Sequence, residues 1–173
     1  MPKIVDHEAY RDELATRAVE VFRRRGYAGI GMREMAKELG MSKSALYHYF
    51  PSKEALFLAC SAKVADVSLD RSRAPVDALV DLAREWEAVF PGEMRIMLDY
   101  IGDRSGEDLR QDEAIERSIQ GFENGLASIV DPRLVPQVLT AIFGFLLLRY
   151  INGRSTPWPE LEALLTSIVS RER

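Results

Sequence analysis

The chain has 173 residues, of which 47% are hydrophobic and 29% charged, the composition of a globular protein with a core of its own. Its single cysteine, Cys60, excludes an internal disulfide framework, and with only two histidines it offers too few ligands for a structural zinc site. The formal net charge is −4, but residues 1–54 carry ten Lys and Arg against eight Asp and Glu, giving +2 and leaving −6 for the rest. We therefore expect a mildly basic N-terminal part and an acidic remainder. From the few cysteines and histidines we expect no metal, and we expect no cofactor.

The first residues, MPKIVDHEAYRDEL, are charged from the start, which is unlike a signal peptide. The most apolar stretch, 141–148, is eight residues long, and its extension back to residue 134 still falls short of a membrane span. The sequence thus predicts a cytoplasmic protein without a membrane partner.

Apolar residues recur at helical spacing along nearly the whole chain, and no segment alternates as a strand would. The spacing predicts a first helix from a cap at Asp6 to a stop at Gly26, a second over 32–39, and a third over about 42–50. A fourth helix starts at a cap on Ser52, ends at the Ala74-Pro75 pair, and carries an apolar face made of Leu56, Cys60, Val64 and Val67. We expect the Cys60 side chain to lie in the core rather than to serve as a redox sensor.

The second half of the chain continues the helical pattern. We expect a fifth helix from residue 75 to the Pro91-Gly92 pair, a short apolar piece over 94–101, and a long helix that stops at Asp131-Pro132. A helix over about 132–152 and a last one after residue 159 complete an all-α fold of about nine helices. Glu85 and Glu87 flank Trp86 and are expected on a solvated face rather than as a catalytic acid–base pair.

The most informative segment is 32–51, MREMAKELGMSKSALYHYFP, which has the residues that a helix-turn-helix needs. Ala36 is small where the two helices would touch, Gly40 can adopt the positive φ of the turn, and Ser42 can cap the second helix. The contact positions around them are hydrophobic: Met35, Leu39, Met41, Leu46 and Tyr49. We predict a helix-turn-helix, and the alternative is a generic helical hairpin.

The second helix of such a unit enters the major groove of DNA. Its solvent face here offers Lys43, Ser44, Tyr47 and His48. Lys43 can reach a guanine or a phosphate, Ser44 can bond either, and Tyr47 can donate to a phosphate. His48 is either a DNA contact or a surface residue without a partner.

The runs Gly26-Tyr27, 32–42 and 46–57 (LYHYFPSKEALF) resemble the N-terminal domain of the TetR family of bacterial transcriptional regulators. The resemblance covers roughly residues 8–60 and implies a homodimer that binds double-stranded, palindromic operator DNA and usually represses until a small ligand releases it. It implies that Lys43, Ser44 and His48 lie near bases, that Tyr47 and Lys53 bind phosphates, and that Arg33 is a further backbone contact. The predicted DNA-binding set is therefore Arg33, Ser42, Lys43, Ser44, Tyr47, His48 and Lys53.

The chain departs from the family pattern at two places. The family usually has Thr or Ser just before the second helix, whereas Gly31 stands there in this chain, so a side-chain contact is lost. The order Tyr-His-Tyr-Phe over 47–50 differs from the more frequent Tyr-Tyr-His-Phe. The family pattern therefore supports the role of Tyr47 more directly than that of His48. The run Arg23-Arg24-Arg25 is expected to complement the dipole at the end of the first helix rather than to bind phosphates.

The body offers large side chains of the kind that line an apolar pocket, although each of them singly is more often plain core. The predicted pocket set is Trp86, Phe90, Met94, Met97, Tyr100, Phe122 and Phe145. Few polar groups lie on these stripes, so the expected effector is a mainly hydrophobic small molecule. The body is short for the family, which favours a small pocket or none.

The last two helices are apolar on more than one side, and a monomer seldom leaves such a patch exposed. We expect them to pair with their symmetry mates in a four-helix dimer interface, as the family resemblance also implies. The predicted interface set is Ile142, Phe143, Leu146, Leu147, Tyr150, Leu161, Leu164, Leu165 and Ile168.

The sequence thus predicts a DNA-binding domain over 1–54 and a helical ligand-binding and dimerisation domain over 55–173. No nucleophile–base pair, metal-ligand spacing or phosphate loop supports an enzyme. The alternative to a DNA-binding regulator is a protein-interaction module whose helix-turn-helix does not bind DNA, which the small charge of the N-terminal part would favour.

Overall fold

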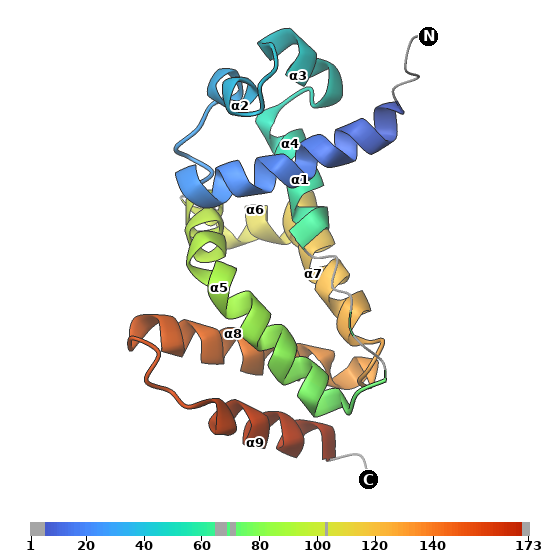
Figure 1. Cartoon of the computed structure of the whole chain (residues 1–173), viewed down its shortest axis with the longest axis vertical. Coiled ribbons are helices and arrows are strands. Elements are labelled where there is room, and N and C mark those ends of the chain that lie inside the picture. Colours follow the sequence, from blue (N-terminus) through green and yellow to red (C-terminus); the bar gives the residue numbers. More distant parts are fainter. Residues whose placement is uncertain (1–5, 65–68, 70–71, 103, 171–173) are drawn as a thin grey trace. The chain divides into compact units, whose positions relative to one another are not determined.

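A computed structural model describes residues 6–64, 69, 72–102 and 104–170 (Figure 1). Every regular element in these ranges is a helix, which confirms the predicted all-α class. The elements are α1 (His7–Arg25), α2 (Met32–Glu38), α3 (Lys43–Tyr49), α4 (Lys53–Val64), α5 (Pro75–Ile101), α6 (Gly106–Arg110), α7 (Glu113–Leu126), the 3-10 turn η1 (Pro132–Leu134), α8 (Val135–Ile151) and α9 (Trp158–Val169). Val67, expected on the apolar face of the fourth helix, lies outside the described residues.

Short-range capping signals place the ends of the first helices where the sequence predicts them. The Asp6 carboxylate accepts hydrogen bonds from the backbone N–H groups of Glu8 and Ala9, at 3.0 and 3.2 Å. The hydroxyls of Ser42 and Ser52 each accept from the N–H three residues later, at 3.1 Å. Gly26 ends α1 with φ +73°, a conformation that side chains rarely adopt.

The chain divides into two compact units, and neither is contiguous in sequence. Unit 1 comprises Met1–Ala65 and Gly92–Ile119, and unit 2 comprises Asp66–Pro91 and Gln120–Arg173. This division differs from the predicted boundary between residues 54 and 55. The reason is visible in the core of unit 1, where Phe57 of α4 stacks on Tyr100 of α5 with ring centroids 4.1 Å apart.

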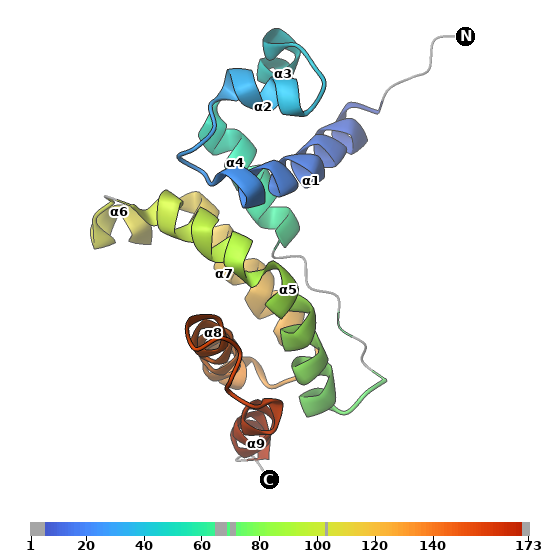
Figure 2. The same ribbon diagram turned by 60° about the vertical axis from the view of Figure 1, so that its left-hand side comes forward.

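Within unit 1, α1 crosses α4, and α2 and α3 lie side by side at one end in both views (Figures 1 and 2). Cys60 lies in the core between α1 and α4, and its thiol donates to the carbonyl of Ala15 at 3.3 Å. Burial raises the pKa of this thiol to about 12, so it stays protonated at neutral pH. The thiol therefore has the environment of a packed core residue, as expected.

The predicted break at Pro91-Gly92 is wrong, because α5 continues unbroken from Pro75 to Ile101. An internal proline costs a helix about 3 kcal/mol through a lost hydrogen bond and a clash. Burial on both sides of the proline offsets this cost: Phe90 is 5% exposed and Ile96 is 7% exposed. The two units divide at this proline, so each half of α5 is held by a different unit.

Two further boundaries differ from the sequence prediction. A short helix, α6, follows a reciprocal cap in which Ser105 accepts from the Asp108 N–H while Asp108 accepts from the Ser105 N–H. In addition, α7 ends at Leu126 and is followed by turns, rather than continuing to residue 131.

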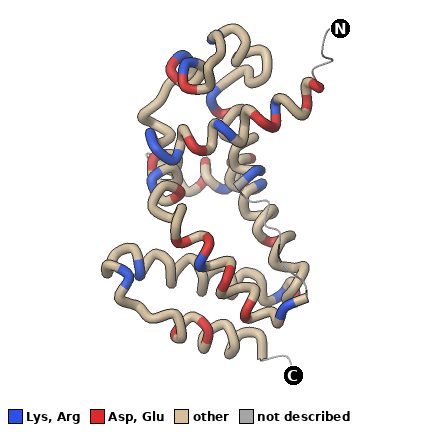
Figure 3. The backbone as a smooth tube through the Cα atoms, in the orientation of Figure 1, with Lys and Arg blue, Asp and Glu red and all other residues tan. Residues whose placement is uncertain are grey.

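In unit 2, α8 and α9 lie side by side in both ribbon views (Figures 1 and 2). The helical run Pro132–Ile151 has 20 residues and a mean hydropathy of 1.8, which is long and apolar enough to cross a membrane by length and composition alone, and it extends beyond the stretch 134–148 judged too short from the sequence. Within the unit 44% of this run is buried, as in the core helix of a globular protein. Charged residues appear only toward the ends of this run in Figure 3.

Candidate nucleic-acid interface

The turn between α2 and α3 has the geometry of a helix-turn-helix. Gly40 adopts φ +72°, and the N–H of Met41 donates to the Ala36 carbonyl at 2.9 Å. Ala36 and Leu46 are buried at 1% and 0% exposure, so the two helices touch where the sequence places small and hydrophobic residues. One face of α3 is thereby fixed inward and the other is left to solvent.

The solvent face of α3 carries the predicted DNA-contacting side chains. Lys43, Ser44, Tyr47 and His48 are all exposed, and the Lys43 ammonium lies 5.4 Å from the centre of the Tyr47 ring. The Ser42 hydroxyl caps α3 and lies 3.1 Å from the Ser44 hydroxyl. Because its hydroxyl accepts from the Ala45 N–H, Ser42 has a structural role at the start of α3.

The first helix of the helix-turn-helix, α2, presents Arg33 to solvent at its first turn. Gly31 makes no side-chain cap, as its lack of a side chain requires, but the Glu34 carboxylate accepts from the Gly31 N–H at 3.3 Å. Glu34 thus supplies the return half of a capping box that the missing Ser or Thr would normally complete.

Arg17 is a supporting residue that the sequence analysis missed. Its guanidinium donates to the Leu39 carbonyl at 2.7 Å and thereby ties α1 to the turn before α3. The two residues are 22 positions apart, and no local pattern distinguishes Arg17 from any other exposed arginine of α1.

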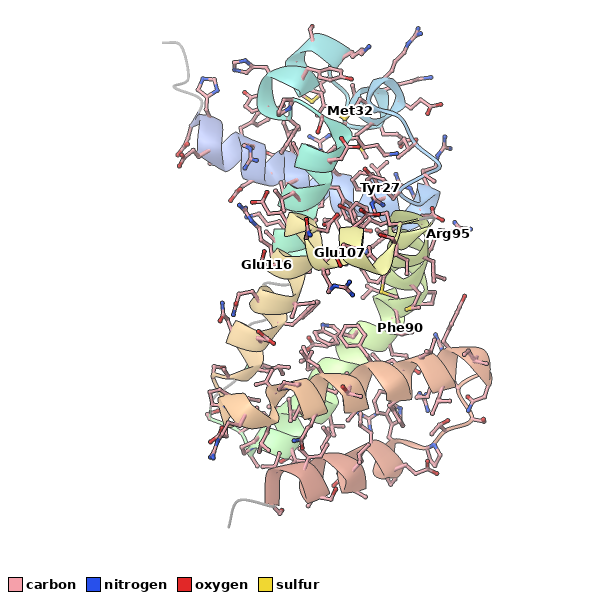
Figure 4. The ribbon with its side chains drawn as sticks, turned by 180° about the vertical axis from the view of Figure 1, so that it is seen from behind. Tyr27, Met32, Phe90, Arg95, Glu107 and Glu116 are labelled. Atoms are coloured by element: carbon pink, nitrogen blue, oxygen red, sulfur yellow. The ribbon has the colours of Figure 1, made fainter. Side chains whose placement is uncertain are left out.

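The arginines that end α1 are used within unit 1. Arg23 pairs with Glu20 and with Glu93, and Arg24 pairs with Glu38 at 3.2 Å. Arg95 donates to the Arg24 carbonyl at 3.1 Å, where it caps the end of α1 (Figure 4). These contacts support the structural interpretation of this basic run.

Lys53 occupies a different environment from the other predicted DNA contacts. Its ammonium lies 4.1 Å from the centre of the Tyr27 ring, and the Tyr27 hydroxyl donates to Glu54 at 3.1 Å (Figure 4). Burial lowers the pKa of Lys53, while the carboxylates of Glu54 and Asp99 act in the opposite direction. Burial also raises the pKa of Tyr27 to about 12, with a further contribution from Glu54. If Lys53 binds a phosphate, its ammonium does so while it also contacts the Tyr27 ring.

The predicted pocket residues fall into both units. Met94, Met97 and Tyr100 belong to unit 1, where Tyr100 is 5% exposed and donates to Asp112 at 2.8 Å. Desolvation of Tyr100 and its hydrogen bond to Asp112 raise the pKa of its hydroxyl. Tyr100 is thus a core residue, whereas Met97 is 44% exposed.

The pocket residues of unit 2 form an aromatic cluster with two residues that were expected at the dimer interface. The Trp86 ring lies 5.2 Å from Phe122 and 5.5 Å from Phe143, and Phe90 lies 6.3 Å from Tyr150. Phe145 does not join this cluster, because its ring lies 5.2 Å from Trp158 of α9 instead.

The predicted interface residues divide by exposure. Five are buried within unit 2 itself, namely Ile142, Leu146, Leu161, Leu165 and Ile168. Three are exposed: Leu147 at 37%, Leu164 at 46% and Tyr150 at 54%. Leu148 and Ile151, which were not predicted, are exposed at 56% and 71% on the same helix. Helical periodicity shows that α8 is apolar all round, but it does not show which side the chain itself covers.

A family model described as bacterial regulatory proteins, tetR family, matches residues 14–60. HTH-type transcriptional regulator PksA of Bacillus subtilis is 38% identical over 71 residues, 41% of this chain and 35% of that protein. HTH-type transcriptional activator FasR of Mycolicibacterium smegmatis is 45% identical over 56 residues, 32% of this chain and 26% of that protein. The match thus spans about a third or less of these relatives' own length.

Solved structures resemble the chain over nearly its whole length. Salmonella enterica GusR has a TM-score of 0.66 at 19% identity and covers 96% of this chain and 98% of its own. A transcriptional regulator FadR from Bacillus subtilis, in complex with stearoyl-CoA, has a TM-score of 0.60 at 18% identity and covers 91% and 97%. At these identities the likeness establishes the fold.

The helix-turn-helix geometry and the sequences that resemble it define residues 14–60 as a helix-turn-helix domain like those of bacterial transcriptional regulators. Residues 14–60 match the bacterial tetR regulator family, and a TetR transcriptional regulator from Rhodococcus sp. RHA1 shares the fold of the chain.

Proposed function

We propose that the chain is a cytoplasmic, sequence-specific DNA-binding regulator that reads an operator with α3. The observation that carries this proposal is the exposed face of Lys43, Ser44, Tyr47 and His48 above a fully buried helix-turn-helix core. A face of this kind suits the major groove, where an α-helix fits and where amine and hydroxyl groups bond base edges and phosphates.

The test is selection of bound duplexes from a random DNA pool, followed by anisotropy titration of the selected sequence at several salt concentrations. We expect an enriched palindrome and an affinity that falls steeply with salt, because bound phosphates release counterions. A folded, dimeric protein that enriches no sequence and binds no duplex would contradict the proposal and favour a protein-interaction module.

Two lysines of the interface should respond differently to removal. Lys53→Ala should weaken binding about equally for all sequences and reduce the salt slope by about 1, since its proposed partner is a phosphate. Lys43→Ala should cost about 1–3 kcal/mol on the preferred operator and relax its sequence preference. Lys63→Ala is the matched control, because Lys63 lies at the other end of α4 and pairs with Asp12 at 2.6 Å. An unchanged salt slope for Lys53→Ala, or uniform weakening for Lys43→Ala, would contradict the respective role.

A homodimer is the second part of the proposal. On α8 the exposed Leu147, Leu148 and Ile151 share the solvent side of the helix with Gly144. The outer face of α9 forms a shallow groove between mostly small side chains, namely Pro159, Glu162, Ala163, Thr166, Ser167 and Ser170. Small residues let a second helix approach closely, so these faces suit a four-helix contact with a second copy. A two-fold dimer would present two α3 helices about 34–36 Å apart to successive major grooves.

The third part is an effector, a mainly hydrophobic small molecule that binds at the half-buried rings of Trp86, Phe122 and Phe143 and releases a repressor from DNA. The aromatic lining supports an apolar ligand. The FadR structure in complex with stearoyl-CoA, which has a long acyl chain, supports the same class of compound.

A further inference from the structure

The two histidines of the chain, 41 positions apart in sequence, meet at one end of α3. His7 opens α1 and His48 lies in the last turn of α3, with their ring centroids 6.0 Å apart. The Tyr49 hydroxyl lies 3.3 Å from Nδ1 of His7, and the Tyr49 ring lies 5.2 Å from that of His48. Tyr49 thus contacts both imidazoles.

Both histidines are exposed at the border of the proposed DNA-binding face. His48 shares that face with Ser44, one helical turn earlier, and His7 lies beside it from another helix. A duplex seated on the exposed face of α3 would bring phosphates toward this pair.

We propose that His7 and His48 form a proton-dependent phosphate-binding pair, so that operator affinity rises as the pH falls through the histidine range. This proposal rests on the proposed DNA-binding function and adds a ligand contact, His7, and a dependence on pH to it.

The physical basis is mutual repulsion that a phosphate relieves. Imidazoles take up protons between pH 5 and 8, and two imidazolium rings 6.0 Å apart repel each other in the free protein. A phosphate beside both rings accepts hydrogen bonds from both and neutralises them. Binding of DNA and protonation of the pair therefore favour each other, and affinity is higher when both rings are protonated.

The charged groups around the pair do not replace the phosphate. Asp6 and Glu8 are the carboxylates next to His7 in the chain, and Asp6 already accepts two backbone N–H groups at the start of α1. Arg11, one turn along α1, places its guanidinium 5.0 Å from the centre of the Phe50 ring. On α3 the other charged residue is Lys43. Among the described residues no third metal-ligating side chain joins the two histidines, which favours an anion over a cation.

The test measures affinity for the selected operator by anisotropy at constant ionic strength, from pH 8 to pH 6. We expect the affinity of the wild type to rise about tenfold over this range, since two protonations contribute. His7→Gln should remove about half of this rise on a logarithmic scale, and His7→Gln/His48→Gln should remove nearly all of it. Glu116→Gln, which changes an exposed titratable residue of α7, should keep the wild-type dependence on pH.

A second readout does not depend on measured affinity. Because the chain has two histidines, their NMR titrations are separable, and operator DNA should raise both midpoints. Operator binding whose affinity is independent of pH, a wild-type pH dependence in His7→Gln, or midpoints unmoved by DNA would each overturn the histidine pair alone. No binding to any duplex at any pH would instead overturn the DNA-binding function itself.

Discussion

Glu87→Ala should lower the free energy of unfolding by about 3–5 kcal/mol, the range found when one partner of a buried ion pair is removed. The Arg149 side chain is only 9% exposed, and its Nε donates to the Glu87 carboxylate at 2.7 Å. The guanidinium also donates to the Thr156 carbonyl and lies 4.7 Å from the centre of the Trp158 ring. Among the described residues Glu87 is the carboxylate that pairs with this cation, so its removal takes away the counter-charge at the contacts between α5, α8 and α9. Urea unfolding followed by circular dichroism measures the loss.

Two variants separate the ion pair from other causes. Glu85→Ala removes an exposed carboxylate two residues away and should change stability by less than about 0.5 kcal/mol. Glu87→Met with Arg149→Met replaces both charges by apolar groups and should recover most of the lost stability. A loss of under 1 kcal/mol in Glu87→Ala would show that Arg149 is adequately solvated or paired by other groups.

The same ion pair shows where sequence reasoning stops. Glu85 and Glu87 look alike in the sequence and were both expected on a solvated face, which is wrong for Glu87, whose side chain is 22% exposed. Its partner is 62 positions away, and only the packing of α8 on α5 brings the two together. The Arg17–Leu39 bond and the His7–His48 pair escape prediction for the same reason.

The helix-turn-helix could be predicted because its determinants are local. A serine cap acts three residues away, and the positive φ of Gly40 is a property of one residue. Pro91 is also a local signal, but here burial on both sides of it prevails. Division of the chain into units is not local at all, since Tyr100 joins the core of α4 from more than 40 positions away.

Leu148→Glu should convert the proposed dimer into a monomer. Leu148 is 56% exposed on the outer side of α8, so the substitution leaves the core of unit 2 intact. In a four-helix contact, however, it would bury two unpaired carboxylates, one from each copy, at a cost of several kcal/mol. Sedimentation equilibrium measures the loss of the dimer directly. Leu98→Glu is the matched control: Leu98 is equally exposed at 56% but lies on α5 in unit 1, so this variant should remain dimeric.

The consequence for DNA follows from multivalency. A dimer that places one α3 in each half-site gains affinity because the second contact is intramolecular, and this gain is commonly 10²–10⁴-fold. Leu148→Glu should therefore bind a palindromic operator about a hundredfold or more weakly, yet bind an isolated half-site as the wild type does. A variant that stays dimeric would place the interface elsewhere than on α8. A monomeric variant with undiminished operator affinity would show that the protein reads one half-site at a time.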